Sequence, residues 1–270
     1  DTEVLVKLLK VIGRIGVPGW GNFSAEADKR CFDCPLVVYE LERLADKPVN
    51  VQRTERKAVI GPLMHSVLAN AMGSPKDKIP GLFDAGFSSV MEKHVLFYFP
   101  DQKIQSAMEA FNIAGRVRDY SGDYFFLVDT SFSGAKSNLF IKNEVEQKIE
   151  IASDGTINKL ATIIYKNPYP ASNCNLEKGD LCLNAPYRNW FRLYVPRGST
   201  LIESSGSEVD IKTYDELGKT VFEGFYGNKY PLRPEGQAKV TFKYKLPFKI
   251  DKGEYRLLIQ KHPGTDGSLY

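Results

Sequence analysis

The fold of this 270-residue chain is decided by residues 122–167, GDYFFLVDTSFSGAKSNLFIKNEVEQKIEIASDGTINKLATIIYKN. In its second half, Val145, Ile149 and Ile151 are separated by mostly charged side chains. A period of two is typical of a half-buried strand, because successive side chains point to opposite faces of a sheet. The turn residues 153–156 interrupt the alternation, which then resumes. We therefore predict a β-hairpin here, and we expect it to open a β domain.

Before this run the apolar residues repeat with the period of a helix. Helical patterns cover residues 2–12, 35–46, 59–73 and 80–92, and a further helix is expected after Asp101. Pro62 lies inside the third pattern, so it either kinks that helix or belongs to its first turn. Residues 95–99, VLFYF, predict a short buried strand.

After the run the pattern is that of strands separated by turn residues. Strand-like segments cover residues 123–131, 137–151, 158–167, 187–195, 208–214, 219–225, 237–248 and 253–261. Strands at this spacing without intervening helices favour a β-sandwich. The predicted fold class is therefore α+β. A mainly helical portion with a few strands is expected over residues 1–118, and an antiparallel, Ig-like β-sandwich over residues 119–270.

Composition excludes several classes of protein. The formal net charge of +3 gives no electrostatic reason to expect nucleic acid or an anionic membrane surface as a partner. We find no apolar run near the ~20 residues that cross a bilayer, and no signal peptide. The chain starts directly on a helical pattern, so we expect that segments of a longer protein precede it. No feature indicates an oligomeric state.

The four cysteines form two local pairs, Cys31 with Cys34 and Cys174 with Cys182. In an oxidising compartment each pair would close a short disulfide, and the spacing favours this interpretation. Free thiols are an alternative, and in a reducing compartment four thiolates could bind zinc. Redox catalysis by the CxxC pair would need a helix starting at its first cysteine, whereas Pro35 places the helix start after the motif.

Other candidates for chemistry are few. His65, His94 and His262 are scattered without ligand spacing, so neither a metal nor a cofactor is expected. The densest polar cluster runs from Asp129 to Asn138. Its backbone N–H groups and Lys136 could bind an anion, but a structured loop between two strands explains the same residues.

A basic cluster, Arg53, Arg56 and Lys57, lies next to the predicted start of the helix over residues 59–73. The helix dipole disfavours cations at an N-terminus unless an anion is held there. The cluster is therefore either an anion site or a solvated basic edge.

Three blocks of sequence resemble an uncharacterised bacterial family, domain of unknown function 4012. They are residues 95–115, VLFYFPDQKIQSAMEAFNIAG, residues 122–151, and residues 186–206, PYRNWFRLYVPRGSTLIESSG. The resemblance implies an envelope protein that is exposed outside the membrane and held by an N-terminal membrane anchor, with this chain as its C-terminal part. Paired cysteines fit that location. The family name implies no activity.

A second similarity concerns the first half of the chain. Residues 12–21, IGRIGVPGWG, and residues 51–68, VQRTERKAVIGPLMHSVL, are similar to the latter half of the LytR–CpsA–Psr glycopolymer transferases. In that family an R-x-x-R-Q motif at a helix start binds lipid pyrophosphate. Arg53 and Arg56 match in type and spacing, whereas Lys57 stands where the family has glutamine.

Two function classes follow from these resemblances. One is a non-catalytic surface or scaffold module of the cell envelope. The other is part of a phosphotransferase that attaches anionic glycopolymers to the cell wall, with cell-wall glycan or lipid pyrophosphate as partner. The resemblance places that family's other acidic and basic residues upstream of Asp1, so we expect this chain alone not to be catalytic.

Overall fold

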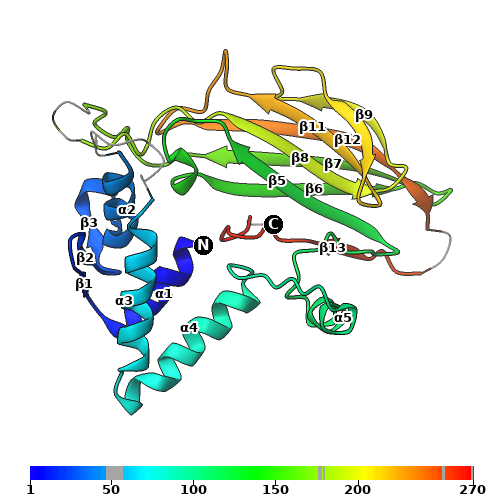
Figure 1. Ribbon diagram of the computed structural model, residues 1–270. Helices are drawn as coiled ribbons and strands as arrows, with labels where there is room; N and C mark the ends of the chain where they lie inside the picture. Colours follow the sequence, from blue (N-terminus) through cyan, green and yellow to red (C-terminus); the bar gives the residue numbers. More distant parts are fainter. Residues whose placement is uncertain (47–56, 176–177, 179, 251–252, 269) are drawn as a thin grey trace. The chain divides into compact units, whose positions relative to one another are not determined.

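The computed structural model describes residues 1–46, 57–175, 178, 180–250, 253–268 and 270. They form two compact units. Unit 1 comprises residues 1–116 and 175–181, and unit 2 comprises residues 117–174 and 182–270. The fold is mixed α+β, with the α-helices in the N-terminal part of the chain, as predicted (Figure 1). Within the described ranges, no helix has both the length and the apolar character needed to cross a bilayer.

Unit 1 is built from α-helices and very short strands. The helices are α1 (Thr2–Ile12), α2 (Leu36–Asp46), α3 (Ile60–Met72), α4 (Ile79–Met91) and α5 (Gln102–Ala110). The strands pair as two small antiparallel ribbons, β1 (Ile15–Val17) with β2 (Gly21–Phe23), and β3 (Ala27–Asp28) with β4 (Cys34–Pro35). Single 3-10 turns, η1 (Lys29–Cys31) and η3 (Lys76–Lys78), complete the unit.

Local sequence explains where these helices begin and end. The Asp1 carboxylate accepts the backbone N–H of Glu3 and caps α1, and the N–H of Gly13 bonds to the carbonyl of Leu9 at the other end. Pro62 lies in the first turn of α3, where a missing N–H costs no helical hydrogen bond. Apolar faces of α1, α2 and α3 pack with β1 and β2 in one core, whose buried members include Val6, Leu9, Phe23, Val37, Leu63 and Val67.

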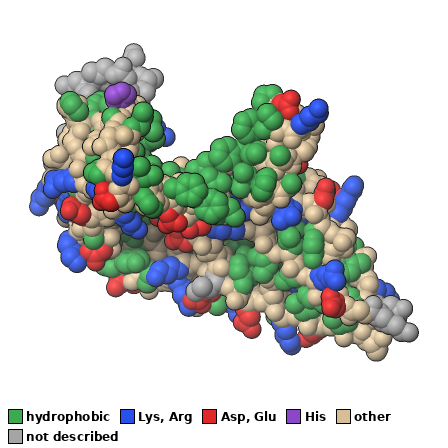
Figure 2. Space-filling view, turned by 90° about the horizontal axis from the view of Figure 1, so that it is seen from below, with side chains coloured by type: hydrophobic (Ala, Val, Ile, Leu, Met, Phe, Trp, Pro, Cys, Tyr) green, Lys and Arg blue, Asp and Glu red, His purple; other side chains and the backbone are tan. Residues whose placement is uncertain are grey.

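Helices α3 and α4 also expose apolar side chains. On α3 the exposed fractions are 56% for Leu68 and 87% for Met72, and on α4 they are 72% for Phe83 and 55% for Phe87. The rings of Phe83 and Phe87 stack with centroids 5.9 Å apart. Apolar side chains are visible on the surface in the space-filling view (Figure 2). Each helix is therefore apolar around most of its circumference, unlike a helix with one buried stripe.

The strand predicted at residues 95–99 is not present. The segment alternates in exposure, with Leu96 and Tyr98 exposed and Phe97 and Phe99 half-buried, but no strand among the described residues pairs with it. Its backbone N–H groups bond singly instead, that of Val95 to the carbonyl of Ser89 and that of Phe97 to the carbonyl of Ile113. The apolar run predicted a buried strand here, but a strand also needs a paired neighbour, which a local run of apolar residues does not supply.

The described residues of unit 2 form nine strands in two sheets (Figure 1). One sheet has the order β10-β11-β8-β5-β13 and the other β6-β7-β12-β9. The strands are β5 (Asp123–Ser131), β6 (Lys142–Ile151), β7 (Thr156–Lys166), β8 (Asn189–Pro196), β9 (Thr200–Ser205), β10 (Lys212–Glu216), β11 (Lys219–Tyr226), β12 (Gln237–Lys249) and β13 (Leu257–Ile259). A 3-10 turn, η4 (Ser137–Leu139), precedes β6.

Neighbouring strands are antiparallel with one exception. The hairpin predicted from residues 122–167 is β6 and β7, in which Val145 lies opposite Ile163 and Ile149 opposite Lys159. The exception is β13, which pairs in parallel with β5. This departs from the fully antiparallel arrangement that we expected. The strand β9 was not expected either, because four of its six side chains are exposed and its sequence, TLIESS, is polar.

One core draws side chains from both sheets of unit 2. Phe125 and Leu127 of β5 meet residues such as Ile163 of β7 and Phe242 of β12 in this core. The alternate residues of β5, Tyr124 and Phe126, belong to a second buried cluster. Strand β5 is therefore covered on both faces, which explains its nearly continuous apolar sequence.

Candidate functional site

The predicted anion site lies mostly outside the described residues. Arg53 and Arg56 belong to residues 47–56, whose structure is not described. Lys57 is exposed in a turn before α3. The first turn of α3 contains no acidic residue, and among the described residues no side chain caps its N-terminus.

All four cysteines are joined in disulfides, Cys31 with Cys34 and Cys174 with Cys182. The short spacing within each pair allows this, since the Cα atoms lie 5.4 Å and 4.3 Å apart. No group of three or more His, Cys, Asp and Glu residues suited to a metal ion occurs in the described part of the chain.

The sequence blocks 122–151 and 186–206 meet in a hydrogen-bonded cluster inside unit 2. The Asp129 carboxylate on β5 accepts hydrogen bonds from the Asn189 amide at 2.7 Å, the Tyr165 hydroxyl at 2.7 Å and the Asn143 amide at 3.0 Å. The Tyr187 hydroxyl in turn donates to Asn189 Oδ1 at 3.1 Å. Residues from three separate segments are thus tied to one carboxylate on β5.

Burial raises the pKa of Asp129, and the hydrogen bonds from Asn189, Tyr165 and Asn143 oppose this rise. Burial raises the pKa of Tyr165 and Tyr187 as well. Both Asn189 and Tyr165 use their side chains on the Asp129 carboxylate, so its hydrogen bonds are made within the protein. Such a network orders a core, whereas a catalytic base needs access to its substrate.

The polar loop after Asp129 is also used structurally. The Ser133 hydroxyl accepts the N–H of Arg188 at 2.9 Å and donates to the carbonyl of Pro186. The Ser137 hydroxyl donates to the carbonyl of Ala185 at 2.6 Å and accepts the N–H of the same residue. Of the two interpretations of this loop, these contacts favour the structured connection between strands.

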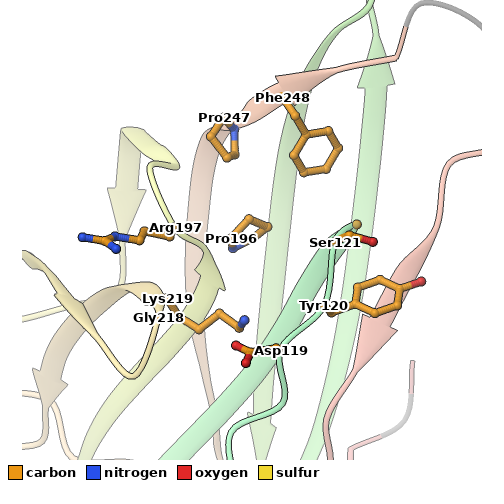
Figure 3. Close-up of a pocket in the computed structure, with 10 residues that line it drawn as sticks. Asp119, Tyr120, Ser121, Pro196, Arg197, Gly218, Lys219, Pro247 and Phe248 are labelled. Atoms are coloured by element: carbon orange, nitrogen blue, oxygen red, sulfur yellow. The ribbon is translucent and has the colours of Figure 1, made fainter.

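Unit 2 has an open cavity of about 510 Å³ beside the start of β5 and the end of β8 (Figure 3). Its lining includes Asp119, Ser121, Arg197, Lys219 and Phe248. In Figure 3 the Lys219 amine points toward the Asp119 carboxylate, and the Arg197 side chain points away from them. Arg197 instead contacts Asp215, with Nε and Oδ2 3.0 Å apart.

Lys219 is the most distinctive residue of this cavity. Only 4% of it is exposed, and its ammonium group lies 4.6 Å from the centroid of the Tyr124 ring. Burial lowers the pKa of Lys219, and Asp119 partly offsets the effect. One cation facing one carboxylate gives little net positive charge, so the cavity is poorly suited to hold a strongly anionic group.

Comparisons with known proteins add no assignment. No protein-family model matches the chain, and no curated protein matches it.

Sequence reasoning did not single out the buried lysines. Lys159 carries a detectable signal, since Ile157, Lys159 and Ala161 share the inward face of an alternating strand. A charged residue at an inward position requires a partner. Lys219 is the first residue of β11 and follows a turn, so the sequence around it gives no comparable indication that it is buried.

Proposed function

We propose that this chain is an extracytoplasmic module of a bacterial cell envelope, related to domain of unknown function 4012. In this proposal unit 2 is an Ig-like β-sandwich that serves as a non-catalytic scaffold or surface module. The observation that carries the location is the joining of all four cysteines in two local disulfides. Disulfides persist in oxidising compartments and are rare in reducing ones.

The polar groups of unit 2 support a scaffold role. Asp129 and Asn189, from two of the sequence blocks that carry the family resemblance, hydrogen-bond to each other between β5 and β8. Ser133 and Ser137, from the adjoining loop, hold the segment before β8. These hydrogen bonds therefore tie the two blocks into the architecture of unit 2. An Ig-like sandwich is supported by two mainly antiparallel sheets that share one core.

The exposed apolar faces of α3 and α4 support membership of a larger assembly. Large exposed apolar surfaces usually mark an interaction site. Met72 and Phe83 are among the exposed residues of these two helices. We propose that the chain functions within a longer, membrane-anchored protein.

The location can be tested by the state of the thiols and by protease access. The chain is produced with an export signal and alkylated under denaturing conditions. We expect no labelled cysteine without reduction and four labelled cysteines after it. In the bacterium that encodes the protein, protease added to intact cells should remove it. Free thiols in the exported protein, or protection until the cells are lysed, would contradict an extracytoplasmic location.

The contribution of the Cys174–Cys182 disulfide to the stability of the exported protein gives a second measurement. Replacing both Cys174 and Cys182 with serine opens a loop of about nine residues. The chain-entropy model gives a loss of roughly 2.6 kcal/mol for a loop of that length. Urea unfolding of this variant against the oxidised parent would measure the loss.

A phosphotransferase related to the LytR–CpsA–Psr family is the alternative. It is favoured by the absence of acidic residues from the first turn of α3, because an N-terminus without a carboxylate can accept a phosphate group. In this alternative, pyrophosphate should raise the melting temperature of the protein at low salt. Arg53→Ala and Arg56→Ala should abolish that shift, and Lys29→Ala, at an exposed lysine elsewhere in unit 1, should preserve it. An equal shift in all variants would leave the scaffold role as the better explanation.

A further inference from the structure

Unit 2 holds a lysine and an aspartate that are both completely buried. Asp123 is the first residue of β5, and Lys159 lies in the middle of β7. Their side chains have no exposed surface, and the Lys159 amine contacts Asp123 Oδ2 directly. Because β5 and β7 belong to different sheets, this contact crosses the core between the sheets.

The surroundings of the pair are aromatic. Lys159 Nζ lies 5.9 Å from the centroid of the Phe125 ring and 5.8 Å from that of Tyr244. The Tyr255 hydroxyl donates a hydrogen bond to Asp123 Oδ2, the same oxygen that contacts Lys159. Asp123 Oδ1 accepts the backbone N–H of Tyr124 at 2.7 Å. The carboxyl group is therefore held in one orientation from both of its oxygens.

Such a site disfavours the ionised pair. Burial lowers the pKa of Lys159, and the attraction of Asp123 only partly restores it. Removing two charges from water costs several kcal/mol per ion, and the mutual attraction often fails to compensate. Transfer of one proton from the ammonium group to the carboxylate removes both charges. The products of that transfer, a neutral amine and a carboxylic acid, are the reactants of amide formation.

We propose that Lys159 and Asp123 become joined by an intramolecular amide bond between Nζ and Cγ. The lone pair of the neutral amine attacks Cγ, and the C–N bond forms as the bond from Cγ to Oδ2 breaks. Oδ2 leaves as water, taking the proton it received from the ammonium group and one further proton from the attacking nitrogen. One water is released, nothing is oxidised or reduced, and no co-reactant is needed.

Tyr255 is a catalytic residue in this reaction, because its hydroxyl contacts the oxygen that leaves. A donor at that oxygen stabilises the negative charge that develops as the C–O bond breaks. Exclusion of bulk water by the aromatic side chains protects the amide from hydrolysis. The bond would link the five-stranded sheet covalently to the four-stranded sheet, which suits a scaffold that must resist unfolding. The reaction uses residues of unit 2 alone and is independent of the proposed location.

The test is the intact mass of the folded, purified chain after denaturation and full reduction of its disulfides. We expect a mass lower by one water molecule than the sequence requires. Tryptic digestion should yield one branched peptide that contains both Lys159 and Asp123. The full sequence mass, with the two residues recovered in separate linear peptides, would overturn the proposal and leave a buried ion pair. A water loss located at other residues would overturn it equally.

Variants with matched controls identify the residues that form the amide bond. Lys159→Met should restore the full sequence mass, whereas Lys219→Met, at a second buried lysine among the described residues of unit 2, should retain the water loss. Tyr255→Phe keeps the ring and should slow the appearance of the lighter species during refolding at least tenfold. A water loss that persists in Lys159→Met would contradict the assignment, and an unchanged rate in Tyr255→Phe would contradict the role of its hydroxyl.

Discussion

At the scale of single residues, a half-buried carboxylate of unit 2 is matched by fixed backbone partners. Glu208, in the loop between β9 and β10, is an example. Its carboxylate accepts four consecutive backbone N–H groups, those of Gly227 at 2.8 Å, Asn228 at 2.9 Å, Lys229 at 3.0 Å and Tyr230 at 2.8 Å. Although burial raises the pKa of Glu208, these four hydrogen bonds together lower it to about 2.

We predict that Glu208→Gln destabilises the protein by about 1–2 kcal/mol at neutral pH, because a neutral amide is a weaker acceptor for these donors. The folded-state pKa lies below the ordinary value of 4.5, so the carboxylate contributes its full stability above that value. The contribution is lost as pH falls from 4.5 toward about 2, where the folded protein also binds the proton.

Urea unfolding of Glu208→Gln and of the parent at neutral pH and at about pH 3 checks this dependence. The difference between the two proteins should shrink at the lower pH. Glu203→Gln is the matched control, since Glu203 is exposed on the neighbouring strand β9. A difference that stays constant with pH would show that the charge of Glu208 is not responsible.

At the scale of elements, the β6–β7 hairpin depends on one glycine. Gly155 adopts φ of +79°, a left-handed conformation that side chains disfavour. A Cβ atom added there would collide with the backbone carbonyl of Ile250, and the Gly155 carbonyl accepts the N–H of the same residue. The turn is therefore both tight and closely packed.

We predict that Gly155→Ala destabilises the protein by roughly 1–3 kcal/mol, from the strained backbone and the displaced Ile250 carbonyl. Gly134→Ala is the control, because φ at Gly134 is not positive and no atom lies within 4 Å of its added Cβ. It should change stability by less than about 0.5 kcal/mol. Thermal unfolding of both variants measures the two effects. Equal stability of both variants would contradict the structural role of Gly155.

Most elements could be predicted because their pattern is local. Helix α1 matches the apolar repeat of residues 2–12, and β5 has the bounds expected for it, 123–131. The failures concern pairing. Residues 95–99 pair with no strand among the described residues, and β9 is a polar strand whose assignment depends on β12 beside it. Local sequence fixes a conformation, whereas a sheet also requires contacts between distant segments.

The same distinction applies to the candidate sites. Asp129 could be named from the sequence as part of a polar cluster, but its contact with Asn189 joins positions 60 residues apart. Lys159 and Asp123 are separated by 36 residues and lie in different sheets. No motif spacing relates such pairs. The inward position of Lys159 in an alternating strand predicts that a partner exists, and the fold is needed to identify it.

At the scale of the whole molecule, tyrosine hydroxyls are an unusual part of the core of unit 2. The core contains four tyrosines with at most 3% exposure, namely Tyr165, Tyr187, Tyr226 and Tyr244. Burial raises the pKa of each of these hydroxyls. The Tyr244 hydroxyl has no hydrogen-bond partner among the residues that the structure describes. Such a core is compatible with neutral phenols and incompatible with phenolates.

We therefore predict that the protein unfolds at alkaline pH. A raised folded-state pKa means that the folded protein retains its phenolic protons above 10.0, where the unfolded chain releases them. Their stabilisation is fully present below 10.0 and is lost as pH rises, because the unfolded state then binds fewer protons. Tyrosinate absorbance, followed together with tryptophan fluorescence, should show the buried phenols ionising only on unfolding.

Tyr244→Phe separates this effect from general alkaline damage. The variant removes a buried hydroxyl that lacks a partner, so it should be about 1 kcal/mol more stable at neutral pH and unfold at a higher pH. Tyr230→Phe, at an exposed tyrosine, should leave the transition unchanged. The prediction fails if all 14 tyrosines ionise in one step while the fold persists, because phenolates would then be accommodated inside the core. The alkaline pH at which the protein unfolds would in that case be set by groups outside the core of unit 2.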